Sequence, residues 1–476
     1  MSKLGYSRAF SSALLGRSCW GQLLSDPHTA LAVGTVSVLG VEWLRGSATV
    51  ATGPTWPLIQ AGIAGIALYV AFIRRNKLKL VAVLALGLAF QLAWIWVHLH
   101  LGVHGDYDPN GLYRHEGHAL LSGHYPNSPY PPGAVALFTF ETWIGGGVAR
   151  VSNALVMVPF QLLCVAAIWA LRTRWSAWWA TVVALWPLNA FFWEFRFDLV
   201  PAAALVVGLL LAYRGHWFGA GLVLGIGAVV KWTPGLSALA LLLWLVWSGR
   251  RRLAAACALG FLAPLVVANV PLFILGRSAL FSPYRMQYKR TMTAESLPYL
   301  VLRLFGKARV HHYFWCPAIA SGLANSTAKV VQEIAVLLAI ALVVLVRNRS
   351  SAIALAAMVP VVFLLSNRVF SPQYFVVILA AWAVGAALVV RGGWKTLALT
   401  ALCAAATTAN AILYPGLAER VNQVHGWTLA LAGSFVPAVL VTLCLVFCAL
   451  QRRTDADEVT GGAKLHPQPR ESPAGV

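Results

Sequence analysis

The chain has 476 residues, of which 59% are hydrophobic and only 11% are charged. Soluble domains carry roughly 25% charged and 45–50% apolar residues, so this composition excludes an ordinary water-soluble protein and indicates a membrane protein. The net charge is +21, but the basic residues lie in short groups between apolar runs. That distribution argues against nucleic acid as a partner. It is typical of loops that contact lipid head groups.

Apolar runs long enough to span a bilayer, roughly 17–25 residues each, recur along the chain. In chain order they lie near 28–44, 55–73, 80–101, 151–171, 176–193, 198–213, 217–231, 234–248, 253–275, 330–346, 351–367, 373–390, 396–414 and 427–450. The runs between 198 and 248 are short enough for two of them to be tilted or re-entrant. The predicted fold class is an all-α polytopic transmembrane helical bundle of about 12–14 spans, with longer external loops at 102–150 and 276–329.

Basic residues set the predicted orientation. Alternate short loops carry basic residues and no Asp or Glu: Arg74, Arg75, Lys77, Lys79, Arg172, Arg174, Arg214, Arg250, Arg251, Arg252, Arg347, Arg349, Arg391 and Lys395. The positive-inside rule places these loops in the cytoplasm. We expect a multi-pass plasma-membrane protein with both termini inside. Its parts are an amino-terminal segment (1–27) without a cleavable signal peptide, a transmembrane domain (28–450) and a disordered polar tail (451–476).

The first external loop carries acidic and aromatic residues just beyond a predicted span. It contains Asp106, Asp108 and Glu116, ahead of a Tyr-Pro-Pro-Gly run that begins at Tyr130. An aspartate in this place can act as a general base that removes the proton from an acceptor hydroxyl. Asp108 followed by Pro109 also suits a helix N-cap with proline at the first helical position, so the structural reading stays open.

Two further polar clusters lie at span ends on the same predicted side. Arg196 and Asp198 flank Phe197; ionisable groups at the edge of an apolar span are costly and usually paired. They either bind a ligand or pair with each other to shape the turn. Lys231 precedes Trp232, and is either a functional cation or a snorkelling lysine beside an interfacial tryptophan.

The remaining external candidates lie in the second long loop and just before the span near 373–390. Arg368, Gln373 and Tyr374 surround a Ser-Pro pair that suits a helix start. The second long loop carries the basic residues Arg277, Arg285, Lys289, Arg290, Arg303, Lys307 and Arg309, followed by His311 and His312. Fixed cations can stabilise a phosphate leaving group; attraction to anionic lipid is the alternative. Apart from this loop, four polar clusters converge on one membrane face: the first external loop, Arg196 with Asp198, Lys231, and the 368–374 segment.

In their order and spacing these segments resemble the glycosyltransferase-C superfamily, and within it the polyprenol-phosphate-mannose-dependent mannosyltransferases of glycosyltransferase family 87. The resemblance runs from Asp106 to Tyr374. It implies transfer of a hexose, expected to be mannose, from a polyprenyl-monophosphate sugar donor to a hydroxyl of a glycan or glycolipid acceptor. Transfer would invert the anomeric centre and take place on the extracytoplasmic face, with the lipid bilayer as environment. No metal motif accompanies Asp106 and Asp108. Because Arg, Lys or His can serve a lipid-monophosphate leaving group, we expect no cofactor and no required metal.

The family's base is an aspartate four residues before the tyrosine, whereas Pro109 occupies that position relative to Tyr113. Asp108 is one position away and is favoured narrowly, while Asp106 stays open. The candidate substrate-binding residues are Glu116, Tyr130, Arg196, Asp198, Lys231, His311, His312, Arg368, Gln373 and Tyr374.

Two alternatives stay open beside this reading. A transferase of another lipid-linked sugar, such as arabinose, would share the architecture, because sugar identity depends on pocket shape. A transporter or lipid flippase belongs to a different class, and it would need ionisable groups or broken helices near the middle of the membrane. The middle of nearly every predicted span is free of charge, which favours the enzyme.

Overall fold

A computed structural model describes residues 65, 68, 79–100, 108–145, 149–186, 192, 195–275, 277–307, 309–310, 318–319, 321–416 and 424–462. The amino-terminal segment 1–27 and the span near 28–44 lie outside these residues, and so does the span near 55–73 except for Gly65 and Leu68. Asp106, His311 and His312 also lie outside them.

The described chain is almost entirely helical. Its first half contains α5 (Leu80–His100), the π-helix η2 (Asp108–Tyr113), α6 (Arg114–Leu121), α7 (Pro132–Gly145), α8 (Ala149–Trp169), α9 (Ser176–Leu185), α11 (Leu199–Arg214), α12 (Trp217–Val230) and α13 (Thr233–Trp247). Its second half contains α14 (Arg251–Leu275), α15 (Arg277–Lys289), α16 (Leu297–Leu304), α17 (Gly322–Leu345), α18 (Arg349–Ser366), η4 (Pro372–Tyr374), α19 (Phe375–Val389), α20 (Gly393–Ala411), η5 (Ile412–Gly416) and α21 (Val424–Gly462). A short antiparallel pair joins β1 (Arg309–Val310) to β2 (Ala318–Ile319).

The predicted all-α membrane fold is confirmed. Among the described residues, seven helices are long and apolar enough to cross a membrane. Five shorter apolar helices accompany them, including α11, α12 and α13 in the region where the predicted spans are short. With 16 residues, α11 is about 24 Å long, less than the roughly 30 Å hydrocarbon core. The chain is therefore a multi-pass membrane protein.

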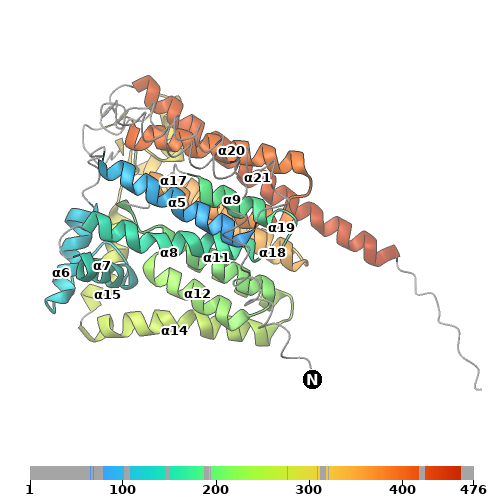
Figure 1. Cartoon of the computed structure of the whole chain (residues 1–476), viewed down its shortest axis with the longest axis horizontal. Coiled ribbons are helices and arrows are strands. Elements are labelled where there is room, and N and C mark those ends of the chain that lie inside the picture. The colour runs from blue at the N-terminus through green and yellow to red at the C-terminus, as the bar shows by residue number, and fades with distance from the viewer. Residues whose placement is uncertain are drawn as a thin grey trace, which may run out of the picture.

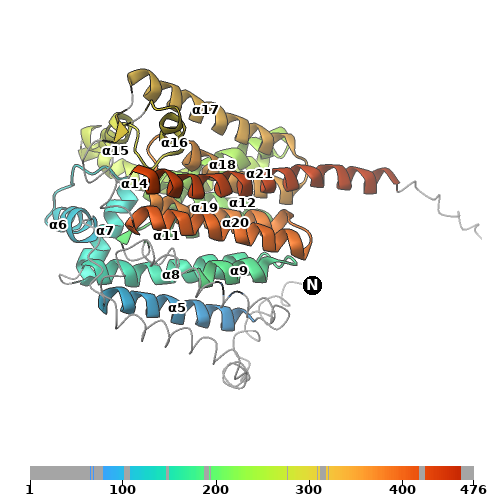
Figure 2. The same cartoon turned by 90° about the horizontal axis from the view of Figure 1, so that it is seen from above.

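The helices lie side by side along the long axis of the molecule, with α14 at one edge and α20 and α21 at the other (Figure 1). In Figure 2, α6, α7 and α15 gather at one end of the bundle. α21 continues to Gly462, beyond the expected end of the last span at 450, and residues 463–476 lie outside the described part of the chain.

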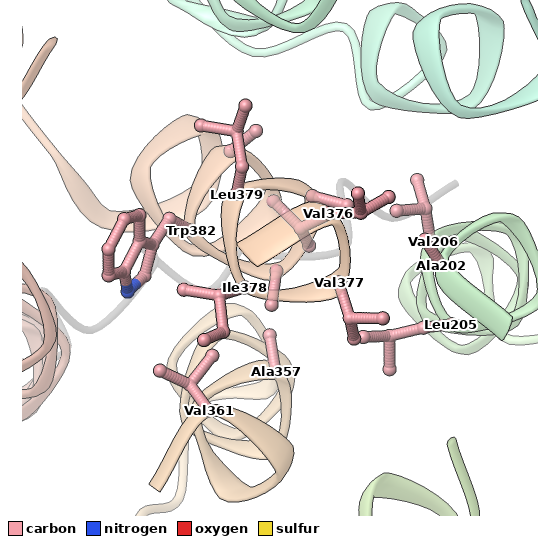
Figure 3. Packing of buried hydrophobic residues seen from close by; sticks show 14 of the residues in the cluster. Ala202, Leu205, Val206, Ala357, Val361, Val376, Val377, Ile378, Leu379 and Trp382 are labelled. Carbon is pink, nitrogen blue, oxygen red and sulfur yellow. The ribbon is translucent and has the colours of Figure 1, made fainter. Parts of the chain in front are cut away.

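The core centres on α19, where every residue is buried. Such a helix is apolar on all sides because helices surround it. Figure 3 shows Val377 facing Leu205 of α11, while Ile378 points toward Val361 of α18. On a third side, the Trp382 indole donates a hydrogen bond to the Thr442 hydroxyl of α21, at 3.2 Å.

Loops that carry the acid-free basic residues meet at one end of the bundle. The Arg214 guanidinium donates to the carbonyl of Ala170 at 2.9 Å, and Arg349 donates to the carbonyl of Tyr213 at 3.4 Å. At this end the Thr173 hydroxyl reaches the carbonyl of Ala387 at 2.7 Å. These bonds join the ends of α8, α11 and α19, so loops predicted to share a membrane side lie together.

Candidate active site

An ion pair joins the first external connection to the turn before α11. Asp108, the first residue of η2, places its Oδ2 atom 3.1 Å from Nη1 of Arg196. The two side chains are 11% and 5% exposed. Arg196 Nη1 also donates to the carbonyl of Phe195 at 2.9 Å. A buried ion pair is stable only when further hydrogen bonds satisfy its charges, so the guanidinium fixes the position of the Asp108 carboxylate.

The second ion pair joins the same turn to the end of α12. Asp198 Oδ1 lies 2.5 Å from the Lys231 ammonium, with side chains 1% and 16% exposed. The ammonium also lies over two rings, 5.1 Å from the centroid of Phe197 and 4.7 Å from that of Tyr374. Because cation–π attraction is strong when the cation is desolvated, both rings help to hold Lys231 in place.

Phe197 lies between the two charged residues and packs into an aromatic cluster. Its ring makes edge contacts with Tyr113 at 5.6 Å, Tyr130 at 5.1 Å and Phe138 at 5.2 Å. Tyr113 in turn stacks on Phe138 with centroids 4.1 Å apart. Edge and offset-stacked pairs are the favoured geometries of aromatic rings. The cluster therefore anchors η2 and α7 against the turn that carries Arg196 and Asp198.

Small residues allow the first external connection to approach the bundle. A Cβ atom at Gly133, the glycine of the Tyr-Pro-Pro-Gly run, would lie 2.9 Å from the carbonyl oxygen of Val229 in α12. A Cβ atom at Gly117 would lie 2.6 Å from the carbonyl oxygen of Phe138. Side chains at these glycines would push α7 away from α12, and α6 away from α7. Both close approaches keep the segment that carries Asp108 and Glu116 next to the turn that carries Arg196 and Asp198.

Glu116 is a second buried carboxyl group near Asp108. It is 2% exposed, and its Oε2 atom accepts a hydrogen bond from the Ser128 hydroxyl at 2.7 Å. The same hydroxyl oxygen accepts the backbone N–H of Tyr130 at 2.9 Å. Burial raises the pKa of Glu116 to about 7; the Ser128 bond lowers it and the charge of Asp108 raises it.

The segment 367–374 contributes to the site unevenly. Tyr374 contacts Lys231, whereas the Arg368 guanidinium donates to the carbonyl of Tyr288 in α15 at 3.0 Å. Gln373 is buried and accepts a hydrogen bond from the Ser371 hydroxyl. Arg368 therefore lies on the side toward the second external connection, and only Tyr374 of these residues touches an ion pair.

The sequence profile of glycosyltransferase family 87 matches residues 129–372, about half of the chain. The chain belongs to glycosyltransferase family 87. It is therefore a membrane glycosyltransferase, and the transporter and flippase alternatives lose their support. No curated protein sequence and no solved structure matches the chain.

This family 87 enzyme brings most of the described candidate residues together. Two ion pairs, Asp108–Arg196 and Asp198–Lys231, account for four of them. The ring of Tyr374 contacts the Lys231 ammonium. Tyr130 joins them through its ring contact with Phe197. The charge of Glu116 contributes to the raised pKa of Tyr130. The matched segment includes both cations, whereas Asp108 and Glu116 precede it and Tyr374 follows it.

Two structural alternatives for the family 87 enzyme are resolved by these contacts. Arg196 and Asp198 do not pair with each other; Arg196 pairs with Asp108, and Asp198 pairs with Lys231. Lys231 is not a snorkelling lysine, because its ammonium is held by a buried carboxylate. In the described part of the chain, no group of three or more His, Cys, Asp or Glu side chains could hold a metal ion.

Sequence reasoning missed Phe197 and Ser128. A signal for Phe197 was present in the sequence, because this aromatic residue lies between Arg196 and Asp198 at the end of a predicted span. An aromatic ring in that place favours packing against other rings beside the charged groups. Ser128 gave none, because its bond to Glu116 depends on how the connection between α6 and α7 folds back.

Proposed function

We propose that this enzyme transfers a hexose, with mannose as the expected sugar, from a polyprenyl-monophosphate donor to a hydroxyl of a glycan or glycolipid. Transfer inverts the anomeric centre and takes place on the extracytoplasmic face of the plasma membrane. The observation that carries the proposal is the pair of buried ion pairs, Asp108–Arg196 and Asp198–Lys231. They lie at the end of the bundle opposite the acid-free basic loops, which the positive-inside rule assigns to the cytoplasm.

Asp108 is the general base in this proposal. Its carboxylate takes the proton of the acceptor hydroxyl while the hydroxyl oxygen attacks the anomeric carbon on the face opposite the phosphate. The bond from the anomeric carbon to the phosphate oxygen breaks, and its electron pair leaves with the phosphate. Arg196 holds the carboxylate in one orientation, as a supporting contact should for a catalytic group.

Lys231 is the proposed contact for the donor phosphate. An ammonium group has three N–H donors, and Asp198 Oδ1 takes one of them. The remaining donors can reach a phosphate whose charge increases as the bond breaks, while Phe197 and Tyr374 keep the ammonium in place. Arg368, Gln373, His311 and His312 are proposed as outer contacts to the donor head group.

A lipid-linked donor fits the location of this cluster. Nucleotide sugars are made in the cytoplasm, and moving a charged diphosphate through hydrocarbon is prohibitive. α13 begins just after Lys231, and its side chains Leu239, Leu243 and Val246 are exposed along its length. A polyprenyl chain in the bilayer can lie against this apolar helix while its sugar phosphate reaches Lys231.

Purified enzyme in nanodiscs tests the donor. Radiolabelled polyprenyl-phosphate mannose, polyprenyl-phosphate arabinose and the corresponding nucleotide sugars are offered with a mixture of lipid and glycan acceptors. We expect labelled product only from a lipid phosphate, with mannose preferred, and a rate lower by roughly 10²–10⁴ in the Asp108→Asn variant. Robust transfer from a nucleotide sugar alone would contradict the proposal, and transfer of arabinose in preference to mannose would correct the sugar.

A further inference from the structure

Three buried oxygen atoms near Asp108 have no hydrogen-bond partner among the described residues. They are the Tyr113 hydroxyl, Oε1 of Glu116 and the Tyr125 hydroxyl, which we call the 113–125 oxygen cluster. Tyr113 and Glu116 are each only 2% exposed. Unsatisfied buried polar groups are uncommon, and each calls for a ligand, an ordered water or another explanation. Three of them within a short segment next to the proposed base point to a ligand.

Two members of the cluster feel the charge of Asp108 directly, and Tyr125 feels that of Glu116. The charge of Asp108 contributes to the raised pKa of Glu116, as it does for Tyr113. Burial raises the pKa of Tyr125 to about 12, and the charge of Glu116 adds to this increase. Charge effects fall with distance, so these effects agree with the short sequence separation of Asp108, Tyr113 and Glu116.

The chemistry of the cluster differs from that of the Lys231 side. Glu116 accepts a hydrogen bond from the Ser128 hydroxyl. It interacts through its charge with Asp108 of η2, and with Tyr125 and Tyr130 of the connection before α7. Tyr284 of α15 also contributes to the raised pKa of Tyr125. Arg196 is engaged by Asp108. The two carboxylates would repel phosphate, whereas carboxylate and hydroxyl oxygens can accept hydrogen bonds from the hydroxyl groups of a sugar.

The cluster lies beside an exposed stretch of backbone. Residues 121–124, between α6 and the Ser128 contact, are exposed. Gly123, with φ of +83°, ends α6: its N–H donates to the carbonyl of Leu120 at 3.0 Å, and the N–H of His124 donates to the carbonyl of Ala119 at 2.9 Å. A left-handed glycine with these two bonds is a common helix end.

We infer that the 113–125 oxygen cluster binds hydroxyl groups of the acceptor beside the hydroxyl that Asp108 deprotonates, so the acceptor is a polyhydroxylated sugar and not a simple lipid alcohol. This inference rests on the proposed function for the role of Asp108. Glu116 is the principal binding group, because its free Oε1 atom can accept a sugar hydroxyl while Oε2 stays on Ser128. The acceptor and donor phosphate then occupy opposite sides of Phe197.

Equilibrium binding tests this inference without any donor. The probe is tritiated octyl mannoside below its micellar concentration, measured by scintillation proximity on enzyme in nanodiscs, with octanol as a competitor. For Glu116→Gln we expect the Kd to rise about 10-fold or more, the usual worth of a hydrogen bond to a charged group. The rise should be partly reversed in Glu116→Asp, and octanol should not displace the probe from the native enzyme.

Glu141 supplies a matched control. It is a buried glutamate of α7, 3% exposed, with an Oε1 atom that likewise has no partner in the described chain. Burial alone raises its pKa, to about 8, so it is not coupled to the Asp108 group. Glu141→Gln should change the Kd less than twofold. Equal affinity in Glu116→Gln and the native enzyme, or equal losses in both glutamine variants, would overturn the inference.

Should Glu116→Gln fail to fold, Ser128→Ala tests the same contact, because it releases Oε2 and leaves the carboxyl group in place. We then expect a threefold or larger rise in Kd, and no rise would overturn the inference. The proposed function fails separately. A native enzyme that binds octyl mannoside but transfers no sugar from any lipid phosphate would contradict the donor assignment and leave the binding site standing.

Discussion

The two ends of the bundle use basic residues in opposite ways. At one end, exposed arginines contact backbone carbonyls and rings: Arg214 lies on Ala170, and Arg250 lies 5.2 Å from the ring centroid of Trp244. At the other end, Arg196 and Lys231 are largely buried, and each faces a carboxylate. The same residue types therefore make exposed contacts at one end and belong to a closed charge cluster at the other.

This difference has an energetic consequence. Exposed ionic contacts contribute roughly 0–1 kcal/mol, whereas removing one partner of a buried ion pair leaves an uncompensated charge and costs about 3–5 kcal/mol. Substitutions at the two ends should therefore differ in how far they lower the free energy of unfolding. We expect a large decrease near Asp108 and Lys231 and a small one near Arg250.

The largest effect is expected from Asp108→Asn. Loss of the general base should lower turnover by roughly 10²–10⁴, while the KM for the donor changes little. Steady-state kinetics with the lipid-phosphate donor measure both quantities, and Asp106→Asn is the companion variant. A comparable loss in Asp106→Asn alone would move the base to that residue. Normal turnover in both variants would remove the catalytic role of this loop.

Next in size is Lys231→Met. A charge-assisted bond to phosphate is worth roughly 1.5–3 kcal/mol, so use of the donor should fall by one to two orders of magnitude. The variant also leaves Asp198 buried without its cation, and thermal unfolding should show a lower Tm. Replacing both residues, as Asp198→Asn with Lys231→Met, should recover much of the Tm but not the activity. Activity that returned with the Tm would make the pair purely structural.

Glu116→Gln should change the pH dependence of stability. Burial raises the pKa of Glu116 from 4.5 to about 7, so the folded state binds this proton more tightly than the unfolded state does. The resulting stabilisation is fully present below pH 4.5 and is lost as pH rises through 7. The fall in Tm between pH 5 and 8 should therefore be smaller in Glu116→Gln. An identical fall in both proteins would place Glu116 in a more solvated environment.

The smallest effect is expected at the basic end. Arg251→Gln combined with Arg252→Gln removes two exposed charges far from either ion pair, and turnover should stay within twofold of the native value. A large loss of turnover in correctly inserted protein would show that the two ends are coupled.

The fold was predictable because membrane insertion depends on local hydrophobicity, which adds along the chain. Each predicted span from 80–101 onward contains a helix, and α14 runs over 251–275 where a span is predicted at 253–275. In the first external connection, η2 begins at Asp108, where the Asp108–Pro109 pair suits a helix start, whereas α6 and α7 were not predicted. They are short and are held by packing against the bundle, as the contacts of Gly117 and Gly133 show.

The site was predictable in composition but not in pairing. Asp108, Arg196, Asp198 and Lys231 could be selected because they are charged and lie at the ends of apolar spans. Burying such groups costs free energy, so they are usually paired or functional. Their partners depend on how separate segments meet in space, which the spacing of Arg196 and Asp198 does not encode. The bond between Glu116 and Ser128 depends in the same way on the path of the connecting chain.

The central claim is that the two ends lie on opposite sides of the membrane, with the ion pairs outside. Cysteines introduced at His124 and Ser321, which are exposed near the site end, and at Arg251 at the basic end test it directly. Intact cells are treated with an impermeant maleimide, and labelling is compared with that of the unsubstituted protein. We expect His124→Cys and Ser321→Cys to label in intact cells and Arg251→Cys to label only after permeabilisation. Labelling of Arg251→Cys from outside, with the other two protected, would contradict the account.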